Sequence, residues 1–215
     1  MSEITVKNLC VKYGEQVVFD SFDATFEKDK INVILGGSGV GKSTLIGSIA
    51  GLVKHDGDID GIDGEISFIF QKDRLIPSIS VFKNLDLVLK SVFKDKEERK
   101  KRIEEMLEIL EISDCKDKKP TEISGGQAQR VSMARAFLYP SEVILMDEPF
   151  VGLDPKASVV MKNMMRDLCE KGGAVFFSTH VLEVAEKLCN KVAIINHGKL
   201  VAQGDMDTVK GNDSL

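Results

Sequence analysis

Apolar and polar residues alternate in the first third of the chain, and this pattern then gives way to short apolar runs. Phe22, Ala24 and Phe26 share one face of an extended segment, which predicts half-buried antiparallel strands. The apolar run 31–35 leads into a glycine-rich segment, and the apolar residues after it recur at helical spacing. A strand, a loop and a helix are therefore predicted in that order.

Helical spacing dominates residues 76–139, where we expect a helical subdomain. The apolar residues of one predicted helix face are Ile103, Met106, Leu107 and Leu110. The charged run just before them resembles a nucleic-acid-binding patch in composition, but its acidic residues precede basic ones by four positions, as on a solvated helix. The predicted ion pairs are Glu97–Lys101 and Glu98–Arg102.

Short buried strands alternate with helices in the last third of the chain. The predicted strands are 143–147, 174–178 and 192–196, the helices are 159–169 and 182–188, and a turn at 196–198 leads to a final strand at 199–203. Alternation of this kind predicts a parallel sheet with helices on both faces, and hence an α/β fold. The length of 215 residues fits a single domain over 1–215.

Composition excludes several classes of protein. The net charge is -5 with basic and acidic residues interleaved, which argues against nucleic acid as a partner. Apolar runs reach only four residues, too few to span a bilayer, and the start lacks the layout of a secretory signal. The four cysteines lie far apart, so neither a zinc site nor a disulfide framework is indicated. A cytoplasmic protein with reduced cysteines is predicted.

The glycine-rich segment satisfies the pattern G-x-x-x-x-G-K-[ST] between a predicted strand and a predicted helix. Its residues are Gly36, Gly37, Ser38, Gly39, Val40, Gly41, Lys42 and Ser43. Glycines allow consecutive backbone N–H groups to point at phosphate oxygens, and the helix N-terminus adds positive potential. Lys42 is expected to reach the β- and γ-phosphates of a nucleotide, Ser43 to bind Mg²⁺, and Thr44 to contact the α-phosphate.

Two acids end the apolar strand at 143–147, at the edge of the sheet where open α/β folds bind ligands. Asp147 is placed to hold Mg²⁺, directly or through water. Glu148 is placed to activate an attacking water as general base. A phosphate loop with these two acids predicts nucleotide hydrolysis.

A third motif carries a specific resemblance. Ser124, Gly125, Gly126 and Gln127 lie in the run ISGGQAQR, which resembles the signature motif of the ABC ATPase family. A Ser-Gly-Gly helix start supplies a capping hydroxyl and unhindered N–H donors, and is a second anion-binding end. The resemblance implies a P-loop NTPase (RecA-like) core with a small antiparallel β-subdomain and an α-helical subdomain.

Other motifs of the same family follow in order over about residues 3–204. The resemblance implies that Tyr13 stacks on adenine and that Gln71 senses Mg²⁺ and the attacking water. It also implies that Asp154, in the sequence GLD, belongs to the loop that crosses to a partner subunit and contributes to ATP binding, and that His180 contacts the γ-phosphate.

Three positions depart from the family pattern. Ile123 stands where Leu is usual, Val151 where a small residue is more common, and Val181 where an acid that could cap the next helix is common. These departures concern fine geometry and leave the prediction of ATP and Mg²⁺ binding unchanged.

The family mechanism implies a head-to-tail dimer, a homodimer in the simplest case, with each ATP between the phosphate loop of one subunit and the signature of the other. It also implies membrane permease subunits docked near Gln71, a peripheral position on the inner face of the cell membrane, and, in an importer, a substrate-binding protein. The segment after Gln71 resembles that of the nitrate, sulfonate and taurine importer branch.

Alternatives remain at this point. An exporter or lipoprotein-release ATPase also comes as one short chain, and some ABC proteins act on ribosomes or DNA instead of membranes. A phosphate-loop kinase outside this family would lack the run SGGQ.

Overall fold

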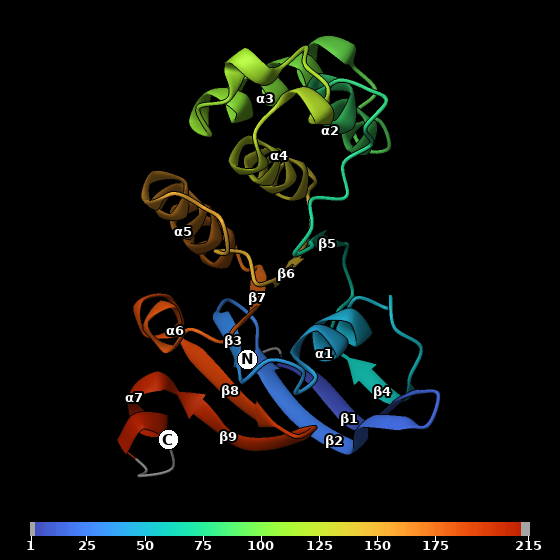
Figure 1. Cartoon of the computed structure of the whole chain (residues 1–215), viewed down its shortest axis with the longest axis vertical. Helices are drawn as coiled ribbons and strands as arrows, with labels where there is room; N and C mark the ends of the chain where they lie inside the picture. Colours follow the sequence, from blue (N-terminus) through green and yellow to red (C-terminus); the bar gives the residue numbers. More distant parts are fainter. Residues whose placement is uncertain (1–2, 212–215) are drawn as a thin grey trace.

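Two sheets form the framework of residues 3–211, the part of the chain that the computed structural model describes (Figure 1). The larger sheet has the strand order β5-β6-β7-β3-β8-β9. Its strands are β3 (Ile31–Leu35), β5 (Ile66–Ile69), β6 (Val143–Asp147), β7 (Ala174–Thr179), β8 (Lys191–Asn196) and β9 (Lys199–Asp205). All pairings are parallel except that of β9, which returns from β8 as a hairpin.

Strand order places the predicted phosphate loop and the predicted acids one strand apart. The loop follows β3, the acids end β6, and β7 lies between these two strands. In the register of the sheet, Ser178 of β7 pairs with Asp147 on one side and with Ile34 on the other. The carboxyl ends of three parallel strands therefore meet at one edge, where ligands bind in open α/β sheets.

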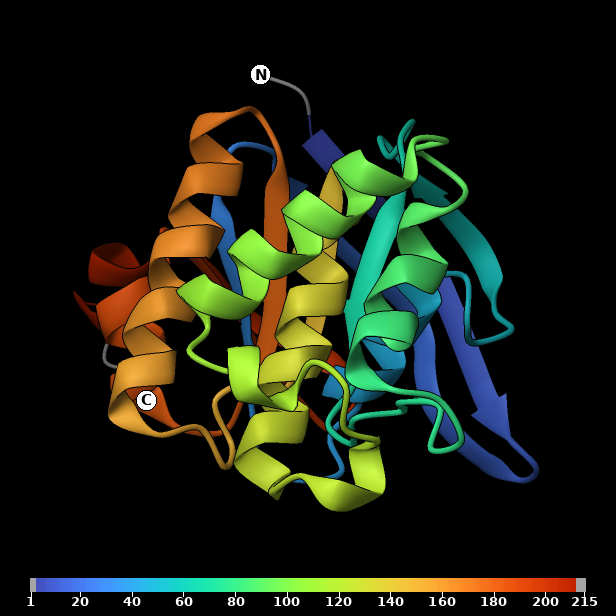
Figure 2. The ribbon, with the colours of Figure 1, turned by 90° about the horizontal axis from the view of Figure 1, so that it is seen from above.

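Both faces of the larger sheet are covered, as the apolar runs predict. Figure 2 looks onto the face that is covered by helices. On one face, Ile34, Leu145 and Phe176 pack with helix α1 (Lys42–Ile49) and with the smaller sheet. On the opposite face, Val33 and Phe177 pack with α5 (Pro155–Glu170), α6 (Leu182–Leu188), α7 (Met206–Gly211) and the helices of residues 81–138. Consecutive strand residues thus enter different cores, which fixes the register.

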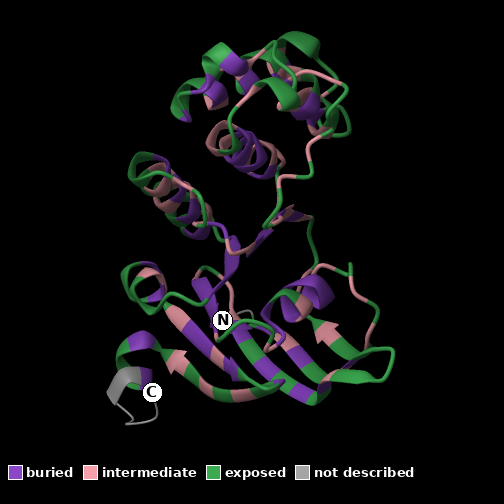
Figure 3. Cartoon of the chain, viewed as in Figure 1, coloured by how far each residue is buried: buried purple, intermediate pink, exposed green. Residues whose placement is uncertain are grey.

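The smaller sheet is antiparallel, with the order β2-β1-β4. Its strands are β1 (Glu3–Tyr13), β2 (Gln16–Glu27) and β4 (Asp56–Asp60). Phe22, Ala24 and Phe26 are buried and their neighbours largely exposed, so the predicted alternation is confirmed (Figure 3). Strand β4 has no sequence signal because four of the five residues in DGDID are Asp or Gly; it forms by pairing with β1.

Residues 81–138 are mainly helical and project away from the smaller sheet (Figure 1). Their elements are α2 (Val81–Leu89), α3 (Lys96–Ile109), η1 (Ser113–Cys115), η2 (Pro120–Glu122) and α4 (Gly125–Leu138). The ion pair of Arg102 with Glu98 is confirmed at 2.8 Å. The pairing predicted for Lys101 is wrong, because this exposed side chain turns to Glu105, one turn in the other direction, at 3.8 Å.

Cys115 and Cys169 are buried, and no disulfide joins the cysteines of residues 3–211. The predicted turn into the last strand is present, with positive φ at His197 (46°) and Gly198 (69°), as a two-residue hairpin turn requires. Within residues 3–211, no helix has the length and apolar character needed to cross a membrane.

Candidate functional site

The loop between β3 and α1 needs glycine at two positions for steric reasons. A Cβ atom on Gly36 would lie 2.4 Å from the backbone oxygen of Ile195 in β8. Gly41 has a φ of +112°, and a Cβ atom there would lie 2.8 Å from the ring of Phe19. The loop backbone is therefore pressed against both sheets, in the strand–loop–helix context that the motif requires.

Lys42 is buried inside this loop. Its Nζ donates hydrogen bonds to the carbonyl oxygens of Gly36 (2.9 Å) and Gly37 (2.8 Å), and lies 3.6 Å from Oε1 of Glu148. The ammonium is thus held at the centre of the loop by neutral oxygens and one more distant carboxylate. A positive charge held among loop N–H groups suits a phosphate anion.

A cavity of about 680 Å³ opens beside Lys42. It is lined by Gly37, Ser38, Gly39, Lys42, Ser43, Gln71, Glu148, Val151 and His180. Gln71 follows β5, Glu148 follows β6, and His180 follows β7. Residues predicted separately from four parts of the sequence therefore line one cavity.

Ser43 and Asp147 form a pair of oxygen donors at the side of this cavity. The Ser43 hydroxyl donates to Oδ1 of Asp147 at 2.8 Å, although the two residues are 104 positions apart. Mg²⁺ prefers hard oxygen ligands and is usually held by one or two protein groups together with water and substrate phosphates. A hydroxyl and a carboxylate side by side, next to an anion-binding loop, fit that ion.

Glu148 has an unusual backbone and a well-contacted side chain. Its φ is +49°, in the left-handed region that residues other than glycine seldom adopt. The side chain is 12% exposed, and its Oε1 lies 3.0 Å from Nδ1 of His180. His180 thus contacts the acid in this structure. A mostly buried carboxylate beside an imidazole at a cavity wall is placed to accept a proton from water.

Tyr13 and the outer side of the loop form a second, smaller cavity of about 230 Å³. Gln16, Val18, Gly39, Gly41, Lys42, Ser43 and Thr44 complete its lining. Tyr13 ends β1, and its side chain is among the exposed large hydrophobic ones at 53%. An exposed aromatic ring next to a phosphate loop offers a stacking surface for a nucleotide base.

The predicted signature lies at the start of α4, and its residues do not line these two cavities. Ser124 caps the helix: its hydroxyl accepts from the N–H of Gln127 at 3.2 Å, and the Gln127 side chain accepts from the N–H of Ser124 at 3.0 Å. A Cβ atom on Gly125 or Gly126 would meet nothing within 4 Å. The helix start therefore has open space beside both glycines.

The carboxylate of Asp154 accepts hydrogen bonds from groups of its own chain. Its Oδ1 accepts from the backbone N–H groups of Lys156 (3.0 Å) and Ala157 (2.9 Å) and so caps α5, while its Oδ2 accepts from Arg130 at 2.5 Å. The hydrogen bond from Arg130 is the main cause that lowers the pKa of Asp154 to about 2, and the backbone bonds add to it. Arg130 also donates to the carbonyl of Leu110 at 2.7 Å.

We expect Asp154→Ala to lower the melting temperature by about 2–4 °C, since loss of an N-cap has that effect in a chain of this size. Asp154→Asn keeps a capping side chain and should recover most of the loss. The folded pKa lies below the unfolded value of 3.8, so the charge contributes stability above pH 3.8 and loses it as the pH falls towards 2. Thermal melts at pH 7 and in this acidic range test both points; equal melting temperatures for Ala and Asn would contradict the capping role.

The sequence patterns did not identify two residues at the site. Ser178, the first polar residue after four apolar ones in β7, contacts both Asp147 and Glu148. Arg130 joins the signature helix to Asp154. The only signal for Ser178 was a polar residue in an apolar strand.

Val181 stands where an acid that could cap the next helix is common, and α6 accordingly begins without a side-chain cap. The Val181 N–H donates instead to Thr179 Oγ1 at 3.1 Å.

Comparisons with known proteins agree with this geometry. The family model described as ABC transporter matches residues 19–151. The chain is 34% identical to the methionine import ATP-binding protein MetN of Clostridioides difficile (strain 630), over 96% of this chain and 70% of that protein. It is 35% identical to the sn-glycerol-3-phosphate import ATP-binding protein UgpC 2 of Agrobacterium fabrum (strain C58 / ATCC 33970), over 95% of this chain. The chain spans only 58% of that second relative's length.

A solved structure extends the likeness to the whole fold. The dimeric ATP-binding cassette MJ0796 in a post-hydrolysis state, bound to ADP and Pi, superposes with a TM-score of 0.86 at 29% identity, over 94% of this chain and 98% of that one. The predicted P-loop NTPase fold is confirmed. The finer placement among nitrate, sulfonate and taurine importers is not confirmed by these relatives. The chain belongs to the ABC transporter family, as one of its ATP-binding ATPase cassettes.

Proposed function

We propose that this chain is the ATP-hydrolysing subunit of an importer whose membrane part is a separate permease. The observation that carries the proposal is one cavity lined by Lys42, Ser43 and Glu148, with Asp147 hydrogen-bonded to Ser43, while the Ser124 helix start lies outside it. The cavity would form one half of an ATP site, and the Ser124 helix start, outside the cavity, would form the other half. The names of the two curated relatives support import as the direction.

Hydrolysis is assigned to residues that line the cavity. Lys42 and the N–H groups of residues 37–43 bind and orient the phosphates, and the buried ammonium stabilises charge that develops on the transferred group. Glu148 Oε1 takes a proton from the water that attacks the γ-phosphorus, while the bond from that phosphorus to the bridging oxygen breaks and ADP leaves. His180, 3.0 Å from Oε1, orients the carboxylate. Gln71 lines the same cavity and positions the water.

Magnesium is proposed at Ser43, Asp147 and Gln71. An ion held there would supply positive charge that offsets the charge of the phosphates. The Ser43 hydroxyl and the Asp147 carboxylate already lie 2.8 Å apart and would hold the ion directly or through water.

A second copy of the chain is proposed to complete the site. In a head-to-tail dimer, Ser124, Gly125 and Gly126 would present their hydroxyl and N–H groups to the phosphates of the ATP bound by the partner. The open space above both glycines supports this role. Asp154, tied to Arg130, would place the neighbouring loop against the partner and so contribute to the ATP site there.

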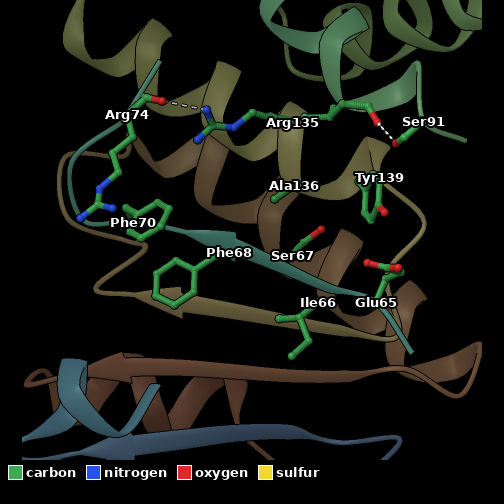
Figure 4. Close-up of a pocket in the computed structure, with 11 residues that line it drawn as sticks. Glu65, Ile66, Ser67, Phe68, Phe70, Arg74, Ser91, Arg135, Ala136 and Tyr139 are labelled. Atoms are coloured by element: carbon green, nitrogen blue, oxygen red, sulfur yellow. Dashed lines mark hydrogen bonds between the residues drawn. The ribbon is translucent and has the colours of Figure 1, made fainter. Parts of the chain in front are cut away.

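The permease is proposed to dock in a groove between β5 and the helices of residues 81–138 (Figure 4). The groove encloses about 540 Å³. Phe68 and Phe70 stack with 4.2 Å between ring centroids, and the Arg74 guanidinium lies 3.8 Å from the Phe70 centroid. Aromatic rings beside a guanidinium fit a segment with an apolar and an acidic side chain. Because Gln71 directly follows Phe70, occupation of the groove would reach the ATP site.

We expect Arg74→Glu to weaken co-purification with the permease by about tenfold or more through charge repulsion. The same substitution should leave ATP turnover of the isolated chain within about twofold, as Arg74 lies outside the proposed catalytic set. Arg102 is a matched control, since its guanidinium lies 4.1 Å from the ring centroid of Phe93 on a different surface. Equal binding by Arg74→Glu and Arg102→Glu would exclude this groove as the docking site.

The function as a whole is tested by purifying the tagged chain from native membranes and reconstituting it with the recovered polytopic protein. ATP-dependent substrate accumulation in proteoliposomes is the expected result. Recovery with ribosomes alone, or ATP-driven efflux, would contradict the proposal.

We further propose that the chain is a single ATPase domain with residues 76–139 as its helical subdomain. It would lie peripherally on the inner face of the cell membrane, and a substrate-binding protein would serve the permease.

A further inference from the structure

Ser178 is a fully buried hydroxyl at the centre of the site. It has 0% exposure and follows the apolar run Ala174–Phe177 in a strand whose residues are all buried. β7 lies between the strand that leads to the phosphate loop and the strand that ends in the two acids. A hydroxyl removed from water is costly unless it is hydrogen-bonded, so its partners are informative.

Both partners of Ser178 belong to the acids. Its hydroxyl donates to Oδ1 of Asp147 at 2.7 Å, and its oxygen accepts from the backbone N–H of Glu148 at 2.9 Å. One side chain thus holds a carboxylate and the next peptide group together. Since Ser43 donates to the same Oδ1 at 2.8 Å, the Asp147 oxygen is fixed from two sides.

The backbone of Glu148 needs such a constraint. Its φ of +49° is unfavourable for a residue with a side chain and persists only where surrounding contacts hold it. Four contacts surround this position. The N–H of Glu148 donates to Ser178, and its carbonyl accepts from the N–H of Val151 at 3.2 Å. The carboxylate lies beside His180 and Lys42. Among these four contacts, the hydrogen bond to Ser178 is the only one that a side chain makes with the Glu148 backbone. Without the hydroxyl, the peptide can relax towards negative φ and carry the Glu148 carboxylate away from its place in the cavity.

We propose that Ser178 is a positioning residue for ATP hydrolysis, which orients Glu148 through its backbone and Asp147 through its carboxylate. The inference rests on the proposed function, because it assigns Ser178 to the same hydrolytic site. It differs from a packing role in one respect: removing the hydroxyl should impair hydrolysis and metal-dependent binding more than it impairs nucleotide binding itself.

The experiment compares Ser178→Ala with Ser178→Thr, which retains a hydroxyl, and with Ser48→Ala as control. Ser48 is also buried and donates one hydrogen bond, to the Thr44 carbonyl at 2.9 Å, outside the proposed catalytic set. We expect turnover of Ser178→Ala to fall about 10- to 100-fold, the usual effect of removing a group that orients a ligand. ATP affinity in EDTA should stay within about twofold, whereas the gain in affinity on adding Mg²⁺ should shrink about tenfold or more.

Structure determination gives a readout that does not depend on activity: in Ser178→Ala the φ of Glu148 should become negative. Ser178→Thr should retain the wild-type φ of Glu148. It should also recover at least half of the turnover that Ser178→Ala loses. The inference is overturned if Ser178→Ala keeps wild-type turnover, if Thr is no better than Ala, or if Ser178→Ala and Ser48→Ala show the same profile. Absence of ATP hydrolysis in the wild-type chain would instead overturn the proposed function.

Discussion

Glu148→Gln is expected to reduce ATP turnover by about 10²- to 10⁴-fold, the range lost with a general base, and to accumulate an ATP-bound dimer. The amide has nearly the same shape as the carboxylate but does not accept a proton from water at neutral pH. ATP binding depends chiefly on the phosphate loop and should persist. Because Oε1 also lies 3.6 Å from Lys42, removing the negative charge should favour the phosphate anion and strengthen binding.

The measurements are steady-state hydrolysis and light scattering at saturating MgATP. Glu142→Gln is the matched control, since Glu142 immediately precedes the same strand and pairs with Lys28 at 2.6 Å, remote from the acids that end the strand. It should lose some stability and retain turnover. A monomeric Glu148→Gln at saturating MgATP would contradict the sandwich dimer, and wild-type turnover would remove Glu148 from the role of base.

Lys42→Ala should lower turnover by about 100-fold or more and weaken ATP binding as well. Its ammonium is the buried positive charge nearest the proposed phosphate position, and loss of one such preorganised donor typically has an effect of this size on catalysis. The side chain also bonds the Gly36 and Gly37 carbonyls, so the loop itself should loosen. The two effects make this variant differ from Glu148→Gln, which keeps binding.

Nucleotide binding by fluorescence titration and hydrolysis under the same conditions distinguish these outcomes. Lys54→Ala is the control, because Lys54 is exposed and lies shortly after the same helix. Unchanged hydrolysis in Lys42→Ala would disprove the phosphate-loop assignment. A loss of hydrolysis with full ATP affinity would restrict Lys42 to stabilising the reacting state.

Sequence patterns anticipated much of the fold because each is carried by neighbouring residues. The period of two at Phe22, Ala24 and Phe26 reflects one buried face of a strand, and β2 has that face. The helix 182–188 was predicted with its observed bounds. Strand β4 was missed since pairing with β1, and not its own residues, makes it extended. The partner of Lys101 was predicted wrongly because an exposed lysine can reach an acid one turn away in either direction.

The phosphate loop was determined by the sequence itself. Eight consecutive residues set its backbone, its N–H groups and its lysine, so no distant contact is needed to recognise it. Tertiary structure decided how the other groups meet. Strand order placed β7 between the phosphate loop and the acids, which brought Ser178 to Asp147 and Glu148 across 31 and 30 positions in the chain. Helix packing also brought Arg130 of α4 into an ion pair with Asp154. Such contacts depend on which strands and helices become neighbours, and local residue patterns do not encode that choice.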